Sequence, residues 1–464
     1  MRSILTQPNA VQLRRYSFVA STESKTNTAW NALLEKYPIE ETVETEGLYH
    51  ITAAAIKEFR EPRLMTKFDT SESVAAPLKE KKLNVLPTSR SSYVIGKFNL
   101  YQEFPESSDR TPTAIPLPEL ETLRIDNLTS ESNAINALVV SGALNDFLGE
   151  EQGALIETFN GRMGTGKFDF RVNLHSPTTL GESSPLEQAL NKQVRINVNK
   201  AQLEIDGGFE SPGSVVIMEA KNVINDDFNV RQLYFPYRRY KSRVHKPIRL
   251  VFSQFTNLTY HLYEYTFTDP ENFSSIKLIK RKAYSFEDQG ITVEDLLSVV
   301  RGTAVTAYDT QGSSDIPFIQ ADRFDRVLSL VEFLSNQPDY EATSSEVTNF
   351  MGLVVRQTAY YTAAARYLGV VDRVGPGKYA LNEQGSNILN FGYKQRQLAY
   401  VRLLSQHHIF NTLLRTALTT GCVPSIDIIT DEMRQHNICI EESTITRRAQ
   451  SVASWIDWVL ALVE

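Results

Sequence analysis

The chain has 464 residues, of which 42% are hydrophobic and 22% are charged, and its formal net charge at pH 7 is −7. This length is too great for one ordinary hydrophobic core, so the composition predicts a soluble globular protein with several domains. The acidic balance excludes a protein that coats nucleic acid through bulk charge, and any DNA binding must come from local basic surfaces. No apolar run reaches the length of a membrane span and the N-terminus lacks the apolar core of a signal peptide, so we expect a cytoplasmic protein without a membrane partner.

The first part of the chain, residues 1–120, is predicted to form an α/β domain that contacts DNA or serves in dimerisation. Apolar residues recur at helical spacing over 27–37 and 53–59, and residues 93–100 have the pattern of a strand. Residues 107–118 are rich in Pro, Thr and Ser, which predicts a linker or a long loop before the next domain.

A helix is predicted to begin at Ser130, a residue type that favours the N-cap position. The glycine-rich segment 161–167 then fits the first seven places of a phosphate-binding P-loop, but Phe168 stands where Ser or Thr would hold Mg²⁺. The residues before this segment read as the end of a helix, whereas a P-loop needs a buried strand there. We therefore interpret the segment as a glycine-rich turn that leads into a strand over 167–173.

Two strands are predicted within residues 203–221, LEIDGGFESPGSVVIMEAK, and both end in charged residues. Asp206 ends the first strand, whereas Glu219 and Lys221 end the second, which opens with the apolar run 215–218. The residues between the strands include five turn formers, Gly207, Gly208, Ser211, Pro212 and Gly213.

The spacing of these charged residues indicates a metal site rather than a solvated strand end. Glu219 and Lys221 are two residues apart and so share one face of their strand. Two carboxylates at close range repel each other unless a cation lies between them, and Mg²⁺ binds such oxygen ligands. The alternative, in which Glu219 and Lys221 merely screen one another, leaves the polar end of a buried strand without a task.

Asp206 and the segment 219–221, Glu-Ala-Lys, resemble the motif of the PD-(D/E)XK nucleases, a superfamily that includes most type II restriction endonucleases. Ile205 stands where the family has Pro, which is a common departure. Gln232, and Tyr237 a few residues on, match a Gln and a Tyr that many members carry at the start of the helix after the E-X-K strand.

The resemblance implies an α/β nuclease core over residues 121–300, with a mixed central β-sheet flanked by helices. It further implies that Asp206, Glu219 and the carbonyl of Ala220 hold Mg²⁺. Lys221 would orient or deprotonate the attacking water, and Gln232 would position the phosphate or the water. In this superfamily a preceding helix sometimes adds a carboxylate, for which three candidates stay open, Glu131, Glu150 and Glu157.

A strongly basic segment follows the E-x-K strand. Residues 229–249 contain seven Arg or Lys residues and no acid, and aromatic residues lie between them. A run of one sign beside a metal site indicates phosphate binding, although these arginines could instead pair with acids elsewhere in the chain. The candidates for DNA contact here are Tyr237, Arg238, Arg239, Lys241 and Arg243.

The last third of the chain is predicted to be helical. Over residues 320–395 three short helices precede a hairpin with a Gly-Pro-Gly turn, an order that resembles the winged helix-turn-helix. Arg and Gln side chains read base edges, which makes the third helix and the wing candidates for DNA recognition. The candidate residues are Arg356, Gln357, Tyr360, Arg373 and Lys378.

A second helical, winged-helix-like unit is predicted over residues 396–464. Its helices are expected over 400–418, 427–436 and 444–462, with Arg447 and Arg448 near the start of the last one. A polar start and an apolar tail suit either a recognition helix or a dimer interface. The cysteines of this unit, Cys422 and Cys439, lack metal-site spacing and are predicted to be core thiols of a reducing cytoplasm.

These features together favour a type II restriction endonuclease that uses Mg²⁺ to hydrolyse both strands of a defined double-stranded DNA sequence. Cutting both strands implies a homodimer or transient pairing of two active sites. A neighbouring gene for a DNA methyltransferase would favour this interpretation, and an enzyme that cuts only methylated DNA fits the same sequence. Two alternatives stay open, a structure-specific DNA repair or recombination nuclease and a DNA-binding regulator with an inactive nuclease-like core.

Overall fold

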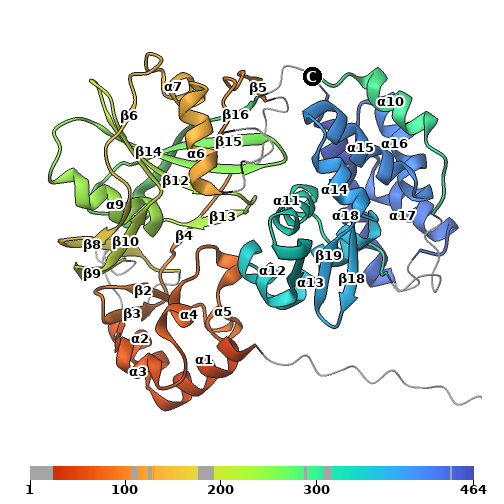
Figure 1. Ribbon diagram of the computed structural model, residues 1–464. Coiled ribbons are helices and arrows are strands. Elements are labelled where there is room, and N and C mark those ends of the chain that lie inside the picture. The colour runs from red at the N-terminus through yellow and green to blue at the C-terminus, as the bar shows by residue number, and fades with distance from the viewer. Residues whose placement is uncertain are drawn as a thin grey trace, which may run out of the picture.

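The computed structural model is a mixed α/β structure with a central mixed sheet and a helical C-terminal region (Figure 1). The strands and helices of the middle of the chain form one part, the orange-red N-terminal part lies below them, and the C-terminal helices lie beside them. None of the described helices has the length and apolar character needed to cross a membrane. The described residues are 24–105, 112–123, 128, 130–175, 193–286, 290–307, 316–438 and 442–463.

The N-terminal part packs helices against a small antiparallel sheet around Trp30. The indole of Trp30 is fully buried and donates a hydrogen bond to the carbonyl of Met65 at 3.0 Å. The sheet has the order β1 (Tyr49–Thr52), β3 (Ser92–Gly96) and β2 (Asn84–Pro87). The helices are α1 (Lys25–Lys36), α2 (Ile39–Glu46), α3 (Ala53–Lys57), α4 (Pro62–Thr66) and α5 (Ala76–Glu80), with a 3-10 turn η1 (Ser71–Ser73). The helices predicted over 27–37 and 53–59 are thus confirmed.

The central sheet has seven strands, which lie in the order β5 (Thr113–Ala114), β16 (Ile276–Ser285), β15 (Thr259–Phe267), β14 (Ile248–Thr256), β12 (Val215–Lys221), β11 (Gly207–Glu210) and β6 (Ile156–Glu157). Strand β12 is parallel to β14, and β16 is parallel to β5, whereas the remaining neighbours are antiparallel. The predicted mixed sheet is therefore confirmed. Between β12 and β14 the chain runs through β13 (Asp227–Asn229), which pairs with β4 (Tyr101–Glu103), and then through α9 (Arg231–Lys241).

Strand β12 is buried on both faces because its apolar residues alternate between two layers. Val216 and Met218 belong to the hydrophobic cluster of α6 (Glu131–Val140) and α7 (Ala143–Leu148). Ile217 belongs instead to the cluster of α9 and β10 (Gln202–Ile205). Helices therefore cover the sheet from two sides, as a strand that is parallel to a neighbour requires.

Two short ribbons adjoin this sheet, and the P-loop-like segment runs from one ribbon to the other. Strand β7 (Gly161–Gly164) pairs with β10, and β8 (Lys167–Asn173) pairs with β9 (Gln193–Asn199). Gly166 has a φ of +87°, which a turn between two strands requires and glycine adopts readily. The predicted strand over 167–173 is confirmed, but the residues before the segment form β6 and not the end of a helix.

The glycines that follow Asp206 lie in a strand and not in the predicted turn. Gly207 and Gly208 open β11, whose pairing with β12 reaches Glu210. A Cβ atom on Gly208 would lie 2.3 Å from the ring of Phe159, so these glycines allow a close approach rather than a reversal of the chain. The turn itself is shorter, and the Ser211 hydroxyl accepts a hydrogen bond from the N–H of Ser214 at 3.0 Å there.

In the C-terminal part, α11 (Phe324–Ser335), α12 (Ser344–Met351) and α13 (Val355–Tyr367) precede a hairpin of β18 (Val371–Gly375) and β19 (Lys378–Leu381). Strand β17 (Glu341–Thr343) pairs with β19, so the hairpin extends to three strands. The predicted order of three helices and a hairpin is therefore present. Thr343 caps α12 and completes a capping box with Glu346.

The chain continues as a helical bundle that shares one hydrophobic core with these helices. The single helix predicted over 400–418 is wrong, because residues 406–407 separate two helices there. Cys422 is exposed and so is not a core thiol, whereas Cys439 lies outside the described residues. The bundle contains α14 (Glu383–Leu389), α15 (Tyr393–Ser405), α16 (His408–Thr420), α17 (Ile426–Gln435) and α18 (Glu442–Leu460), and α10 (Val293–Gly302) packs on α15 and α16.

The three parts of the molecule meet at Arg326 on α11, whose side chain is almost completely buried. Its Nε donates to the carbonyl of Ile224 at 2.9 Å, in the segment that follows β12. Its guanidinium also lies 2.6 Å from a carboxylate oxygen of Glu72 in the N-terminal part and 3.4 Å from one of Asp226. Gln357 of α13 donates to the other Glu72 oxygen at 3.1 Å. One buried cation therefore joins all three parts close to the end of β12.

Candidate active site

The charged residues at the end of β12 share one side of the sheet. The strand is buried from Val215 to Ala220, and only 7% of Glu219 is exposed. Ile217, Glu219 and Lys221 alternate along the strand, so their side chains project toward the layer that contains α9. A buried strand thus brings one carboxylate and one ammonium group to the same place.

Asp206 lies between β10 and β11, where the chain passes from the small ribbon to the central sheet. Its Oδ2 accepts a hydrogen bond from the backbone N–H of Ala220 at 2.9 Å. This bond attaches the Asp206 carboxylate to β12, directly beside Glu219. Asp206 thus reaches the site because the chain passes there from the small ribbon to the central sheet, and not because it lies in the turn of a hairpin.

The ammonium group of Lys221 lies at the centre of the site. It donates hydrogen bonds to Glu219 Oε1 and to the carbonyl of Ala220, both at 2.8 Å. A carboxylate oxygen of Glu131 is 3.3 Å away, and one of Asp206 is 3.8 Å away. Three carboxylates therefore surround a single ammonium, and when all four groups are ionised their charges, three negative and one positive, sum to −2.

Burial and this excess of carboxylates both change the proton affinities of the site. Burial raises the pKa of Glu219 to about 8, although the attraction of Lys221 opposes the shift. Burial also raises the pKa of Glu131. Burial alone would lower the pKa of Lys221, but attraction by Glu219, Glu131 and Asp206 outweighs it and raises that pKa well above its usual value. The lysine is therefore fully charged at neutral pH, and the carboxylates compete for it.

Gln232, the second residue of α9, connects the helix to the site. Its amide Nε2 donates a hydrogen bond to Glu219 Oε1, the oxygen that also binds Lys221. Its own Oε1 is buried and has no hydrogen-bond partner among the described residues. An unpaired buried carbonyl beside three carboxylates is suited to a further cationic or hydrogen-bonding ligand.

The donor set fits a hard divalent cation such as Mg²⁺. The ligand atoms implied by the resemblance are carboxylate oxygens of Asp206 and Glu219 and the carbonyl oxygen of Ala220, and Mg²⁺ prefers such oxygens. Lys221 already lies within 3.8 Å of an oxygen from each of these residues, so they converge on a cation. When all four groups are ionised, as they would be with a cation bound, their net charge of −2 matches a divalent ion.

Helix α6, which precedes the Asp206 strand, adds one carboxylate to the site. The sequence alone left three candidates for this carboxylate. Glu131 is the first residue of α6, and the hydroxyl of Ser130 caps that helix. Glu150 accepts a hydrogen bond from the Ser214 hydroxyl at 2.9 Å, and Glu157 accepts one from Asn160, so neither belongs to the site. The N-terminal position of Glu131 was visible in the sequence, but the packing of α6 against β12 was not.

The N-terminal part also borders the site, which the sequence did not predict. Asn229, just before α9, forms two hydrogen bonds with the segment 67–69, to the carbonyl of Phe68 at 3.0 Å and to that of Asp69 at 2.8 Å. Arg231, at the start of α9, lies 4.0 Å from Asp69. The charge of Asp69 contributes to the raised pKa of Lys221. The segment 67–69, which lies more than 130 residues before Asp206 in the chain, therefore forms one wall of the site.

Of the five predicted DNA contacts on α9 and after it, three are used within the fold. Tyr237 is buried against Phe267. Arg238 donates to the carbonyl oxygens of Asp169 and Pro270 at 3.0 Å. Arg239 donates to the carbonyl of Gly164. The other two predicted contacts, Lys241 and Arg243, are exposed at the end of the helix and stay predictions.

The predicted DNA contacts of the C-terminal part divide in the same way. Gln357 is bonded to Glu72, and Arg448 is buried and donates to the carbonyl of Ile319 at 3.0 Å, so both join elements of the fold. Arg356 is exposed and donates to the hydroxyl of Tyr360, which is partly buried, at 2.6 Å. The remaining exposed candidates are Arg373, Lys378, which pairs with Glu341, and Arg447. For the exposed residues DNA contact stays a prediction.

Comparison with known families divides the chain into three stretches. Models of three domains of unknown function match it, DUF6996 over residues 27–95, DUF6997 over residues 96–285 and DUF7226 over residues 326–464. No curated protein and no solved structure matches the chain. The candidate site lies within the DUF6997 stretch, which contains Glu131, Asp206, Glu219, Lys221 and Gln232.

Proposed function

We propose that this protein is a Mg²⁺-dependent endodeoxyribonuclease, and specifically a type II restriction endonuclease. The observation that carries the proposal is the convergence of Asp206, Glu219 and Glu131 on Lys221 at the end of a buried strand. The chain order supports it, because a carboxylate-bearing helix, the Asp206 strand, the Glu219–Lys221 strand and the helix with Gln232 follow one another. The parallel pairing of β12 with β14, which follows α9 in the chain, also supports the proposal of a restriction-endonuclease-like core.

Each side chain has a task in phosphodiester hydrolysis. Asp206, Glu219 and the Ala220 carbonyl would hold Mg²⁺, which supplies positive charge to the scissile phosphate and activates water. Lys221 places a permanent positive charge where negative charge grows on the phosphate during the reaction, and it orients the attacking water. Gln232 fixes Glu219 through its amide nitrogen, and its buried Oε1 is left to accept a hydrogen bond from a water or another ligand. The reaction adds the elements of water across one P–O bond and needs no other reactant.

Sequence recognition is assigned to the C-terminal part. Helices α11 to α13 and the strands β17, β19 and β18 support a winged-helix unit, and Arg356 and Arg373 are exposed on its third helix and its hairpin. The hydrogen bond of Gln357 to Glu72 and the burial of Arg448 restrict the proposed reading surface to the exposed residues. Cutting both strands requires two such sites, which favours a homodimer on DNA.

The proposal is tested by incubating the purified full-length protein with methylated and unmethylated phage DNA and Mg²⁺, beside the variants Asp206→Ala and Glu219→Ala. Discrete fragments that both substitutions abolish are the expected result. Cleavage of branched DNA without discrete fragments would favour a structure-specific repair nuclease. Tight binding of DNA without cleavage of any substrate would overturn the nuclease and favour a DNA-binding regulator.

Glu131 is expected to act as the additional acidic residue of the site. Glu131→Gln should lower the cleavage rate by about 10- to 100-fold and raise the Mg²⁺ concentration needed for the half-maximal rate. The reason is that glutamine removes one negative charge near the cation but keeps the size of the side chain. Glu157→Gln is the matched control, since Glu157 lies outside the site, and its rate should be unchanged. Equal rates for the two variants would exclude Glu131 from the site.

A further inference from the structure

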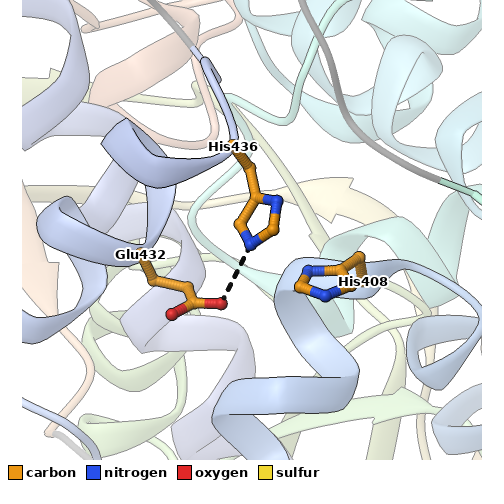
Figure 2. Close-up of side chains that lie close together, drawn as sticks. All are labelled: His408, Glu432 and His436. Atoms are coloured by element: carbon orange, nitrogen blue, oxygen red, sulfur yellow. Dashed lines mark ion pairs between the residues drawn. The ribbon is translucent and has the colours of Figure 1, made fainter.

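A second group of metal-ligand side chains lies in the C-terminal bundle, outside the candidate active site. Figure 2 shows His408, Glu432 and His436, whose side chains converge from two helices. His408 is the first residue of α16, Glu432 lies in the last turns of α17, and His436 is the C-cap residue of α17. All three side chains are partly buried.

The spacing of the ligand atoms is suited to a metal ion. One nitrogen from each histidine and one oxygen of Glu432 all lie within 4.8 Å of one another. Glu432 Oε1 and His436 Nε2 are 3.3 Å apart. Ligands held at roughly 2.0–2.1 Å around a tetrahedral Zn²⁺ are separated by about 3.3 Å, so this pair already has the required separation. The rings of His408 and His436 are tilted by 50° with their centroids 4.0 Å apart, so both imidazoles lie on the same side of the cluster, and they have to move apart slightly for both to bind one ion.

The backbones that carry these side chains are fixed by the fold. The N–H of His408 donates to the carbonyl of Ala307 at 2.9 Å, beside an isolated bridge that anchors residue 407. On α17 the neighbouring Ile429 and Met433 are completely buried, which sets the face of the helix that carries Glu432. A site whose ligands stand on rigid elements loses little entropy when the ion binds.

The chemistry of the ligands selects the ion. Two imidazoles and one carboxylate form a borderline donor set that Zn²⁺ binds well and that Mg²⁺, which prefers oxygen ligands, does not. Because the side chains are partly exposed, water can complete the coordination. The ion would join the start of α16 to the end of α17, which are neighbours in the bundle.

We propose that His408, Glu432 and His436 bind one Zn²⁺ ion that fastens α16 to α17. The simpler possibility is that Glu432 and His436 form only an ion pair at a helix C-terminus, with His408 stacked beside them. The two possibilities differ in whether added zinc binds and stabilises the protein. The proposal does not depend on the nuclease activity.

The test uses the full-length protein with Asp206→Ala and Glu219→Ala, so that the candidate active site cannot account for the zinc. After EDTA treatment and dialysis against micromolar Zn²⁺, elemental analysis should find about one zinc per chain, and Tm should rise by a few degrees. Co²⁺ in place of zinc should give the visible absorption bands of a low-coordinate site. Adding His408→Ala, Glu432→Gln or His436→Ala should weaken zinc binding at least tenfold, whereas the control His50→Ala, an exposed histidine, should not.

The decisive comparison is between His436→Ala and His50→Ala. Should both proteins retain the same zinc content and the same zinc-dependent shift of Tm, the cluster does not bind the ion and the proposal is overturned. If the protein binds no zinc at micromolar concentration, Glu432 and His436 form only an ion pair. The same conclusion would follow if Glu432→Gln lowered Tm by the same amount in the presence and in the absence of zinc.

Discussion

Glu219→Gln is expected to reduce cleavage of double-stranded DNA by about 10³-fold or more while the protein remains folded. Glutamine keeps the size of the side chain, but it removes the charge at the oxygen shared by Lys221 and Gln232. Single-turnover rates at saturating Mg²⁺ measure the effect. The control is Glu204→Gln, a glutamate on β10 whose side chain is half exposed and pairs with Arg162, for which an unchanged rate is expected.

The same variant should change how stability depends on pH. Because burial raises the pKa of Glu219 to about 8, this group stabilises the metal-free protein only while it is protonated. Its contribution is complete below the unfolded pKa near about 4.3 and is lost as the pH rises through the folded pKa. For the wild type the loss amounts to as much as about 5 kcal/mol between pH 4 and pH 9.

Glu219→Gln has no such group and should therefore be at least as stable as the wild type at pH 9. The measurement is urea unfolding in EDTA at pH 5, 7 and 9. A variant that is inactive and also strongly destabilised at pH 9 would show that Glu219 holds the fold together rather than serving the reaction. A variant that cuts DNA at the wild-type rate would remove Glu219 from the site.

Arg326→Ala is expected to lower the free energy of unfolding by about 3–5 kcal/mol. The substitution removes the buried guanidinium that binds Glu72 and the carbonyl of Ile224, and it leaves both acceptors without that partner. Urea unfolding followed by tryptophan fluorescence measures the effect, because Trp30 reports on the N-terminal part and Trp455 on the C-terminal part.

Arg323→Ala is the matched control for that experiment. Arg323 pairs with Asp226, one of the acids near Arg326, but both side chains of that ion pair are more than 40% exposed. Its loss should cost less than about 1 kcal/mol. If the two variants were equally stable, the buried junction would not hold the three parts together.

The centre of the candidate site could be predicted from the sequence because it depends on local rules. The alternation of a strand places Glu219 and Lys221 on one face, and the apolar run before them indicates burial. The place of Asp206 could be inferred from the predicted strand before it, although the glycines after it were wrongly assigned to a turn. Their role depends on the ring of Phe159, almost 50 residues away in sequence, and no local pattern shows such a contact.

The parts of the prediction that depended on surface exposure were less accurate. A run of arginines suggests a phosphate-binding surface, but Arg238 and Arg239 bind backbone carbonyl oxygens of segments about 70 residues earlier in the chain. Carbonyl acceptors have no signature in the sequence, so such partners are invisible before the fold is known. Glu131 could not be chosen over Glu150 and Glu157 for a similar reason, since the choice depends on how α6 packs against β12.

The junction at Arg326 also bears on how far this protein can be taken apart. Expressing the middle stretch alone would deprive Ile224 and Asp226 of the guanidinium that lies beside them, within five residues of Lys221. Expressing the C-terminal stretch alone would remove both carboxylate partners of the Arg326 guanidinium, which is buried in the full chain. The three stretches are distinct in sequence, yet they are not interchangeable modules. A chimera that replaces the C-terminal part therefore needs an arginine at the position of Arg326 that can pair with Glu72 and Asp226.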